Sequence, residues 1–238
     1  GVDGNASLFL LNPQGIFFGP QARLDIRGSF LASTADRILF ADGSEFTATP
    51  SPTNSLLTFS VPLGVQYGTS SGLIQSQGHL AVGQDLTLAA DNLELQGQLR
   101  AGNDLSLQAQ NRVEIRDSAT QAFTAIAGKN LLVQGNHTLD IVALSHPGSG
   151  LQAGGDLILR SGNTVNGDAH FQAGGRFRVE QLTGELGNLY SPQDPVILTS
   201  GNVELGNYTG ASLHILAGGS VTLGNVTITG SDTTGNAI

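Results

Sequence analysis

One short phrase recurs along most of this 238-residue chain, and its period limits the fold more than any other feature of the sequence. The phrase is a small residue, a short link, an Asp or Asn in most copies, and then an apolar-x-apolar triplet. The position that Asp or Asn usually holds falls at residues 85, 104, 130, 156, 176, 202 and 220, so the steps are 19, 26, 26, 20, 26 and 18 residues. Repeats of this length are typical of solenoids, in which each unit packs only on its neighbours.

The order of residues within one unit indicates which solenoid this is. The 19-residue unit contains alternating apolar segments at 86–88, 93–95 and 99–101, separated by Asp91-Asn92 and Gly97-Gln98. Alternation indicates strands with one buried face, and Asn, Asp and Gly supply the positive-φ and side-chain-capped conformations of tight corners. A leucine-rich repeat is the nearest competitor, but the unit has no room for its helix-length segment. The sequence therefore predicts an all-β fold, a right-handed parallel β-helix with three strands per turn.

The repeat also predicts the buried core. The apolar residues of the phrase should form stacked interior columns: Leu86, Leu88, Leu105, Leu107, Leu131, Val133, Leu157, Leu159, Phe177, Val179, Val221 and Leu223. The seven additional residues of the 26-residue units predict bulged loops. The alanine-rich run at 119–127 leaves open one or two helical turns in one of these loops.

The first 68 residues differ in composition from the rest. Seven of the ten Phe and five of the eight Pro lie in 1–62, although alternation persists at 24–26, 30–32, 38–40 and 46–48 and resumes at Leu56. We expect these early coils to be a specialised form of the later ones, so 1–68 and 69–238 are two regions of a single continuous stack. At ~22 residues per turn and ~4.8 Å per turn, the stack should have about 10 or 11 turns and be on the order of 50 Å long.

Composition excludes several classes of function. The formal net charge is −9 and the chain has one Lys, so no basic patch can neutralise nucleic-acid phosphates or an anionic membrane. The absence of Cys removes disulfides and thiolate chemistry, and no run of 18 apolar residues predicts a membrane-spanning segment. The chain starts at Gly1 without a signal-peptide pattern, so we expect it to be a piece of a longer protein.

The column of Asp and Asn residues is the most regular polar feature. Its members are Asp85, Asp104, Asn130, Asp156 and Asn202. A calcium ladder is one interpretation, but the known nonapeptide calcium repeats place Asp every nine residues. The spacing here favours a ladder of Asx turns, each capping the backbone donors of its own corner. The histidines have no metal-ligand spacing either, so we expect no metal and no cofactor.

A cluster of charged residues offers the best candidate for catalysis. With the apolar residues of 156–180 facing inward, seven charged or titratable side chains should face outward: Asp156, Arg160, Asp168, His170, Arg176, Arg178 and Glu180. This set resembles the acid, base and Arg complement of β-helical polysaccharide lyases. The same register, however, stacks Asp156 on Arg176 and Arg160 on Glu180, as ion pairs on adjacent rungs. We favour ion pairs and expect no enzyme, with a polysaccharide lyase or hydrolase as the alternative.

One motif near the start of the chain carries a resemblance to a known family. Asn12-Pro13-Gln14-Gly15-Ile16 is followed by Gly19 and then by the alternating segment 24–26. Asn-Pro starts a turn and Gly15 can close it with a positive φ. The motif is similar to the Asn-Pro-Asn-Gly-Ile hallmark of filamentous-haemagglutinin-type exoproteins of two-partner secretion systems, with Gln14 in place of the second Asn.

This resemblance implies a route and a partner. It implies that 1–68 is the C-terminal part of a secretion (haemagglutination activity) domain, in which Asn12, Pro13, Gln14, Gly15, Ile16 and Gly19 are secretion determinants. The periplasmic domains of a dedicated outer-membrane pore would bind the unfolded chain, which would then fold outside a Gram-negative-type cell, coil by coil. It further implies a secreted or cell-surface adhesin, whose other parts would carry any host or neighbouring-cell ligand.

Overall fold

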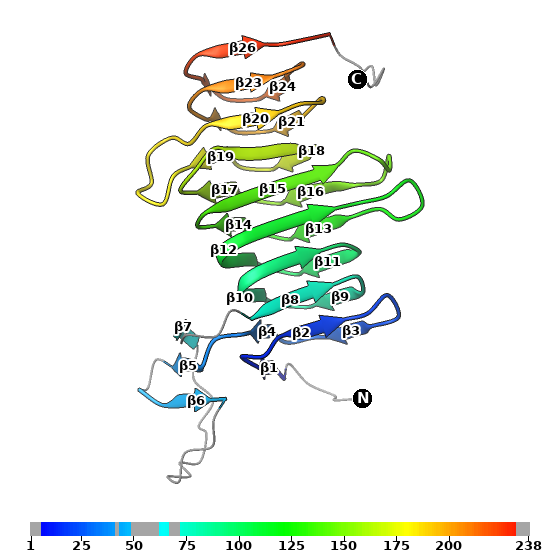
Figure 1. Cartoon of the computed structure of the whole chain (residues 1–238), viewed down its shortest axis with the longest axis vertical. Coiled ribbons are helices and arrows are strands. Elements are labelled where there is room, and N and C mark those ends of the chain that lie inside the picture. The colour runs from blue at the N-terminus through cyan, green and yellow to red at the C-terminus, as the bar shows by residue number, and fades with distance from the viewer. Residues whose placement is uncertain (1–5, 41–42, 49–61, 67–71, 232–238) are drawn as a thin grey trace.

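The computed structural model describes residues 6–40, 43–48, 62–66 and 72–231, and these residues form strands joined by turns, with no helix. Parallel pairing joins 23 strands into one stack (Figure 1). In chain order the strands of the stack are β1 (Leu8–Leu11), β2 (Ile16–Phe18), β3 (Arg23–Ile26), β4 (Phe30–Ser33), β8 (Leu73–Ser76), β9 (His79–Val82), β10 (Leu86–Leu95), β11 (Gln98–Ala101), β12 (Leu105–Arg116), β13 (Thr124–Ala127), β14 (Leu131–Gly135), β15 (Thr138–Ala143), β16 (Gly150–Ala153), β17 (Leu157–Ser161), β18 (Val165–Ala173), β19 (Phe177–Glu180), β20 (Leu189–Ser191), β21 (Val196–Thr199), β22 (Val203–Glu204), β23 (Tyr208–Gly210), β24 (His214–Ala217), β25 (Val221–Thr222) and β26 (Val226–Ile228).

The strands of the stack pair in parallel with the equivalent strands of the neighbouring turns, which confirms the predicted parallel β-helix. The described chain makes nine turns, which begin at Leu8, Phe30, Leu86, Leu105, Leu131, Leu157, Phe177, Val203 and Val221. The expected 10 or 11 turns was too high, because the chain between β4 and β8 leaves the stack.

The segment that leaves the stack forms a small antiparallel sheet, at the lower left of Figure 1. β5 (Arg37–Phe40) pairs with β6 (Glu45–Thr47) on one side and with β7 (Pro62–Gln66) on the other. The expectation that 38–40 and 46–48 are coils of the helix was therefore wrong, and Leu56 lies outside the described residues. The alternation of apolar residues did not distinguish this antiparallel sheet from coils of the β-helix, because strands of either kind bury every second residue.

A second, smaller core holds this sheet against the stack. Phe9, Leu11 and Leu31 face outward from β1 and β4, and they pack against residues of the antiparallel sheet. The rings of Phe9 and Phe40 meet edge to face, with centroids 5.7 Å apart. Both sides of β4 are therefore covered by apolar side chains, whereas Leu8 and Leu10 on the other side of β1 are exposed.

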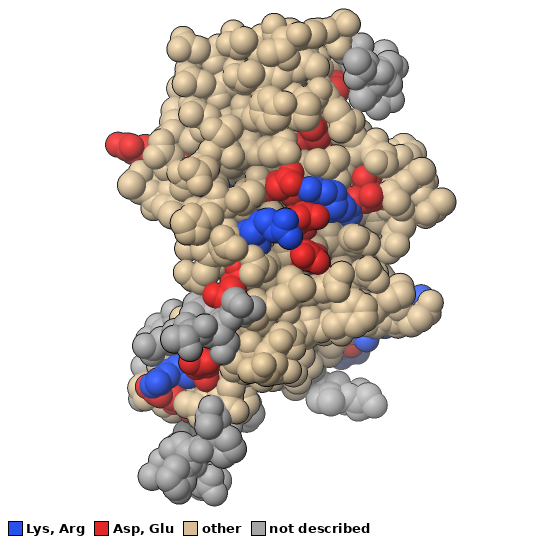
Figure 2. Space-filling view, viewed as in Figure 1, with Lys and Arg blue, Asp and Glu red and all other residues tan. Residues whose placement is uncertain are grey.

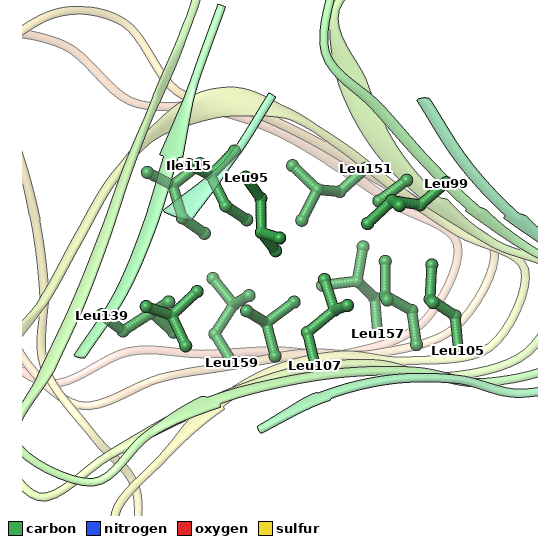
Figure 3. Packing of buried hydrophobic residues seen from close by; sticks show 14 of the residues in the cluster. Leu95, Leu99, Leu105, Leu107, Ile115, Leu139, Leu151, Leu157 and Leu159 are labelled. Carbon is green, nitrogen blue, oxygen red and sulfur yellow. The ribbon is translucent and has the colours of Figure 1, made fainter. Parts of the chain in front are cut away.

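The main core runs along the interior of the stack, as Figure 3 shows for Leu and Ile residues of neighbouring turns. Of the twelve residues predicted for the interior columns, the ten from Leu86 to Val179 are buried. Val221 and Leu223 are not: Val221 is 47% exposed and Leu223 is only partly buried. They lie in the last described turn, which no further described turn covers.

Glycine recurs in the phrase because successive turns approach closely. A Cβ on Gly102, Gly128 or Gly154 would overlap the carbonyl oxygen of the glycine one turn earlier. Among the described residues only Gly15, Gly43, Gly97 and Gly184 have positive φ, so the corner at Gly97 uses the conformation that we expected and the Asp and Asn corners do not. At Asp91-Asn92 the strand β10 continues through the corner with a shift in register.

The alanine-rich run at 119–127 contains no helix. Ser118 and Gln121 close a tight turn through two backbone hydrogen bonds of 3.0 and 3.2 Å. Phe123, Ala125 and Ala127 then point into the core, with β13 beginning at Thr124. Burial of alternate residues therefore decides the conformation over the helix propensity of alanine.

Candidate functional site

The motif Asn12-Pro13-Gln14-Gly15-Ile16 forms a closed turn between β1 and β2. The Gly15 N–H donates to the Asn12 carbonyl at 3.1 Å. The Asn12 side chain accepts a hydrogen bond from the Gln14 N–H at 3.1 Å and donates one to the Gly15 carbonyl at 3.0 Å. Both ends of the Asn12 amide are therefore used inside the turn, as in an Asx turn.

The tight turn at 12–16 packs against residues 72 and 73, which belong to the second coil of the β-helix. Gly15 has φ +120°, and a Cβ there would lie 3.0 Å from the Leu73 carbonyl oxygen. A Cβ on Gly72 would in turn lie 2.7 Å from the Pro13 carbonyl oxygen. Gly15 is thus required both by its backbone conformation and by close packing. Ile16 packs against the main core.

Gly19 lies beyond β2, away from the turn that the five motif residues make. Its carbonyl accepts a hydrogen bond from the Ala22 N–H at 2.8 Å, which closes the next corner. A Cβ on Gly19 would meet only the ring of Phe17, at 3.5 Å, and its φ is not positive. The fold around Gly19 therefore does not require a glycine.

Three residues of this region, Asn12, Gln14 and Phe17, are exposed to solvent. Gln14 is exposed, and the turn uses only its backbone N–H. Phe17 is 63% exposed on the outer face of β2, while its neighbour Phe18 packs edge to face on Phe30 at 6.1 Å. We did not predict the exposure of Phe17, because a run of three apolar residues does not tell which one faces out.

The Asp and Asn column forms a ladder between turns. The Oδ1 atom of Asp85, Asp104, Asn130 or Asp156 accepts the N–H of the equivalent residue in the next turn, at 2.9 to 3.3 Å. The expectation that each residue caps its own corner was therefore wrong. The ladder is interrupted at Arg176 and resumes from Asn202 to Ser220 at 2.9 Å.

The structure adds two features to this ladder that the sequence did not reveal. Ser7 and Ser29 hold the same position in the first two turns, where a hydroxyl oxygen accepts the next N–H at 3.2 and 3.3 Å. A second ladder joins Asn188, Asn207 and Asn225 at 2.8 and 2.9 Å. Among the described residues no three His, Cys, Asp or Glu side chains come together to hold a metal ion.

The charged residues at 156–180 form ion pairs on adjacent rungs. Arg176 Nε lies 2.9 Å from Asp156 Oδ2, and Arg160 Nη2 lies 2.6 Å from Glu180 Oε1, which confirms the two predicted pairs. Arg178 bridges Glu180 at 2.8 Å and Glu204, and its hydrogen bond to Glu204 raises the pKa of this guanidinium. Five of the seven residues of the lyase interpretation are thus held in ion pairs.

Asp168 does not face outward with that cluster. We expected it to face outward with the other charged residues, but it is fully buried at the corner inside β18. His170 is only partly buried on the same strand. The strand turns between these two residues, because its two ends belong to different faces of the stack.

A second ion-pair cluster lies on β10, β12 and β15. Arg112 bridges Glu94 at 3.2 Å and Glu114 at 2.8 Å, and Arg116 binds Glu114 at 3.7 Å and Asp140. Figure 2 shows charged side chains of both signs gathered near the middle of the stack. Opposite charges are therefore paired across rungs here as well.

The comparisons with known proteins point to one family. The family model of the TPS (two-partner secretion) secretion domain matches residues 1–179. No curated protein and no solved structure matches the chain. In the part of the chain that the structure describes, no helix is suited to crossing a membrane.

Proposed function

Because the chain belongs to the two-partner secretion domain family, whose members are exported exoproteins of Gram-negative bacteria, we propose that it is the secretion-signal and scaffold segment of a large adhesin-like surface protein. Its partner is the outer-membrane transporter of the same two-partner system, whose periplasmic domains bind the chain before it folds. The chain has no catalytic role and needs no cofactor. The product is secreted or held at the cell surface, and other parts of the full protein carry its ligand-binding site.

The observation that carries this proposal is the turn at 12–16 inside the matched domain. Both ends of the Asn12 side-chain amide are used within the turn, and its backbone N–H donates to the Ser33 carbonyl, so these groups of the exposed Asn12 are already hydrogen-bonded in the folded motif. The hydrogen-bonding groups of Asn12 would therefore be available to the transporter mainly in the unfolded chain. Recognition before folding agrees with export through a pore.

The architecture also suits folding outside the cell. Every described strand of the stack pairs only with equivalent strands in neighbouring turns, so a turn can add to the one before it as the chain emerges.

We keep 1–68 as the region that bears the motif and the antiparallel insertion, and 69–238 as the repeat region. The family match continues past residue 68 to residue 179.

Export and stability can be separated by mutation. The full-length precursor is expressed with its transporter, and extracellular protein is measured beside the denaturation midpoint. Asn12→Ala with Gly15→Ala should abolish export while costing about 1 kcal/mol for the lost cap and ~1–3 kcal/mol for the strained φ. Gly184→Ala is the matched control, because Gly184 has φ +86° and open space around it, so it carries similar strain outside the motif.

A second variant leaves the turn intact. Gln14→Ala removes an exposed side chain that the turn does not use, so it should lower export without shifting the midpoint. Normal secretion of both the double variant and Gln14→Ala would reduce the motif to a structural turn. Export that falls equally in Gly184→Ala would show that stability alone controls secretion.

A further inference from the structure

Six polar residues meet at one corner of the stack where three successive turns lie over one another. They come from β18, from β20 and the loop after it, and from β23, β24 and the loop between them: Asp168, Ser191, Asp194, Tyr208, Ser212 and His214. Asp168 is 0% exposed and Asp194 is 2% exposed. Two carboxyl groups are therefore buried at this corner, whereas the ladder residues Asp85, Asp104 and Asp156 are exposed or only partly buried.

The two carboxyl groups have different partners. Asp194 Oδ1 accepts the Ser212 hydroxyl at 2.7 Å and faces His214 Nδ1 at 2.6 Å. Asp168 Oδ1 accepts the Ser191 hydroxyl and the Gln193 N–H, the latter at 3.0 Å. Asp168 Oδ2 is buried and has no hydrogen-bond partner. A charged oxygen without a partner in the interior is strongly unfavourable.

The charges around Asp168 do not relieve this cost. The acidic groups near it are Asp140 on β15 and Asp194, which disfavour a second negative charge. Arg116 on β12 is bound to Asp140 and Glu114, and His214 faces Asp194. Tyr208 on β23 donates its hydroxyl to the Ser212 carbonyl, and burial raises the pKa of Tyr208 to about 12, so it stays neutral.

A carboxyl group in this position can be neutralised by a metal ion or by a proton. A metal ion needs several ligands, and the described residues hold no group of three acidic or His side chains. A proton needs only the unpartnered Oδ2. Burial also raises the pKa of Asp168, outweighing the hydrogen bonds from Ser191 and Gln193, which lower it.

We propose that Asp168 is a proton-binding site of the folded protein, and that the bound proton stabilises the turns containing β18, β20 and β23 by removing an unpartnered buried charge from between them. The unfolded chain has an ordinary Asp and loses this proton at lower pH than the folded chain does. The folded state therefore binds more protons between the two pKa values, so its stability falls as pH rises through that window. The stabilisation is complete below the ordinary pKa of 3.8 and is lost above the raised one.

The test is hydrogen exchange of the purified protein, followed by mass spectrometry as protection factors from pH 8 down to pH 4. In the wild type, protection of peptides covering β20 and β23 should rise once pH falls below the raised pKa of Asp168, by up to about tenfold per pH unit, while peptides covering β10 and β12 change less. Asp168→Asn is neutral at every pH, so it should abolish this local dependence. Asp156→Asn is the control, because it removes a partly exposed carboxyl group from the outer ladder.

A second measurement does not depend on the variant folding. The side-chain carboxyl ¹³C signal of Asp168 in the wild type should titrate above the ordinary pKa of Asp. Titration at an ordinary value would overturn the proposal, as would an unchanged pH dependence in Asp168→Asn. Protection that calcium raises at pH 8 and a chelator removes would overturn it in favour of a metal site.

Discussion

The first two turns of the stack and the turns from β10 to β19 share one backbone arrangement but use their outer faces differently. In the middle turns the outer face is polar, and it carries the Asp and Asn ladder and the paired charges. In the first two turns the ladder position is serine, and the outer face of β1 and β4 is apolar and covered by the antiparallel sheet. The interior maintains the fold in both regions, so the outer face is where the N-terminal region is specialised.

The largest expected effect comes from the interior of the middle turns. Leu107→Ala should lower the free energy of unfolding by ~2–5 kcal/mol, because Leu107 is fully buried between neighbouring turns. Leu8→Ala makes the same truncation at a position that is 46% exposed, and it should cost less than about 1 kcal/mol. Denaturation midpoints of the two variants measure the difference, and equal losses would contradict the description of the core.

The glycines of the two regions should differ almost as clearly. Gly128→Ala places a Cβ against the Gly102 carbonyl oxygen and should cost ~1–3 kcal/mol through overpacking. Gly19→Ala meets only the Phe17 ring and should change stability by less than ~0.5 kcal/mol. A loss of export in Gly19→Ala at an unchanged midpoint would assign this glycine to recognition. A large loss of stability there would show that the corner itself needs glycine.

The hydrogen-bond ladder of Asp and Asn residues should contribute moderately to the free energy of unfolding in the middle turns. Asn130→Ala removes the acceptor of the Asp156 N–H, at 3.0 Å, and should cost about 1 kcal/mol. Asn130→Asp keeps this acceptor but loses the amide donor to Asp104, so thermal denaturation of the two variants separates the roles. An Asn130→Ala variant as stable as the wild type would mean that water replaces the ladder without cost.

The ion pairs on the outer face should contribute less to the free energy of unfolding than the core or the ladder does. Arg176→Ala breaks the pair with Asp156, which is partly exposed, and should cost less than about 1 kcal/mol. High salt should reduce even this difference.

Incubation of the wild type with polyuronates should release no unsaturated sugars. Release that Arg176→Ala abolishes would instead establish the lyase activity.

Removal of divalent cations should have no effect. The ladder oxygens of Asp104 and Asp156 already accept backbone hydrogen bonds, so the column needs no calcium to hold its turns together. The melting temperature should therefore be the same in chelator and in millimolar calcium. A substantially lower value in chelator would mean that the Asp column binds metal.

Much of the architecture could be predicted because the repeat is local. The spacing of Leu86, Leu105, Leu131 and Leu157 predicted a shared interior column, and these residues lie in register. The motif turn at 12–16 was predicted from Asn, Pro and Gly, whose conformational preferences act within a few residues. The pairing of Arg160 with Glu180 also followed from the register.

Other features depend on residues that are distant in sequence. The buried polar corner joins Asp168 to Ser191 and to the neighbourhood of Tyr208, and alternation alone placed Asp168 on the surface. The exposed Phe17 and the partly buried Phe18 have the same residue type, and only the position of the strand distinguishes them. The antiparallel insertion has the same alternation as the stack and was taken for part of it.

The sequence by itself thus determined the parallel stack, its interior columns and the motif turn, because each depends on a short pattern that nearest-neighbour pairing repeats or that a few adjacent residues complete. Only the tertiary structure decided which side chains meet between turns. The Asp and Asn residues bond to the next turn, and the outward Phe9 and Leu31 are covered by the antiparallel sheet. The physical reason is that these contacts join residues 18 to 56 positions apart, over distances at which no local pattern distinguishes one partner from another.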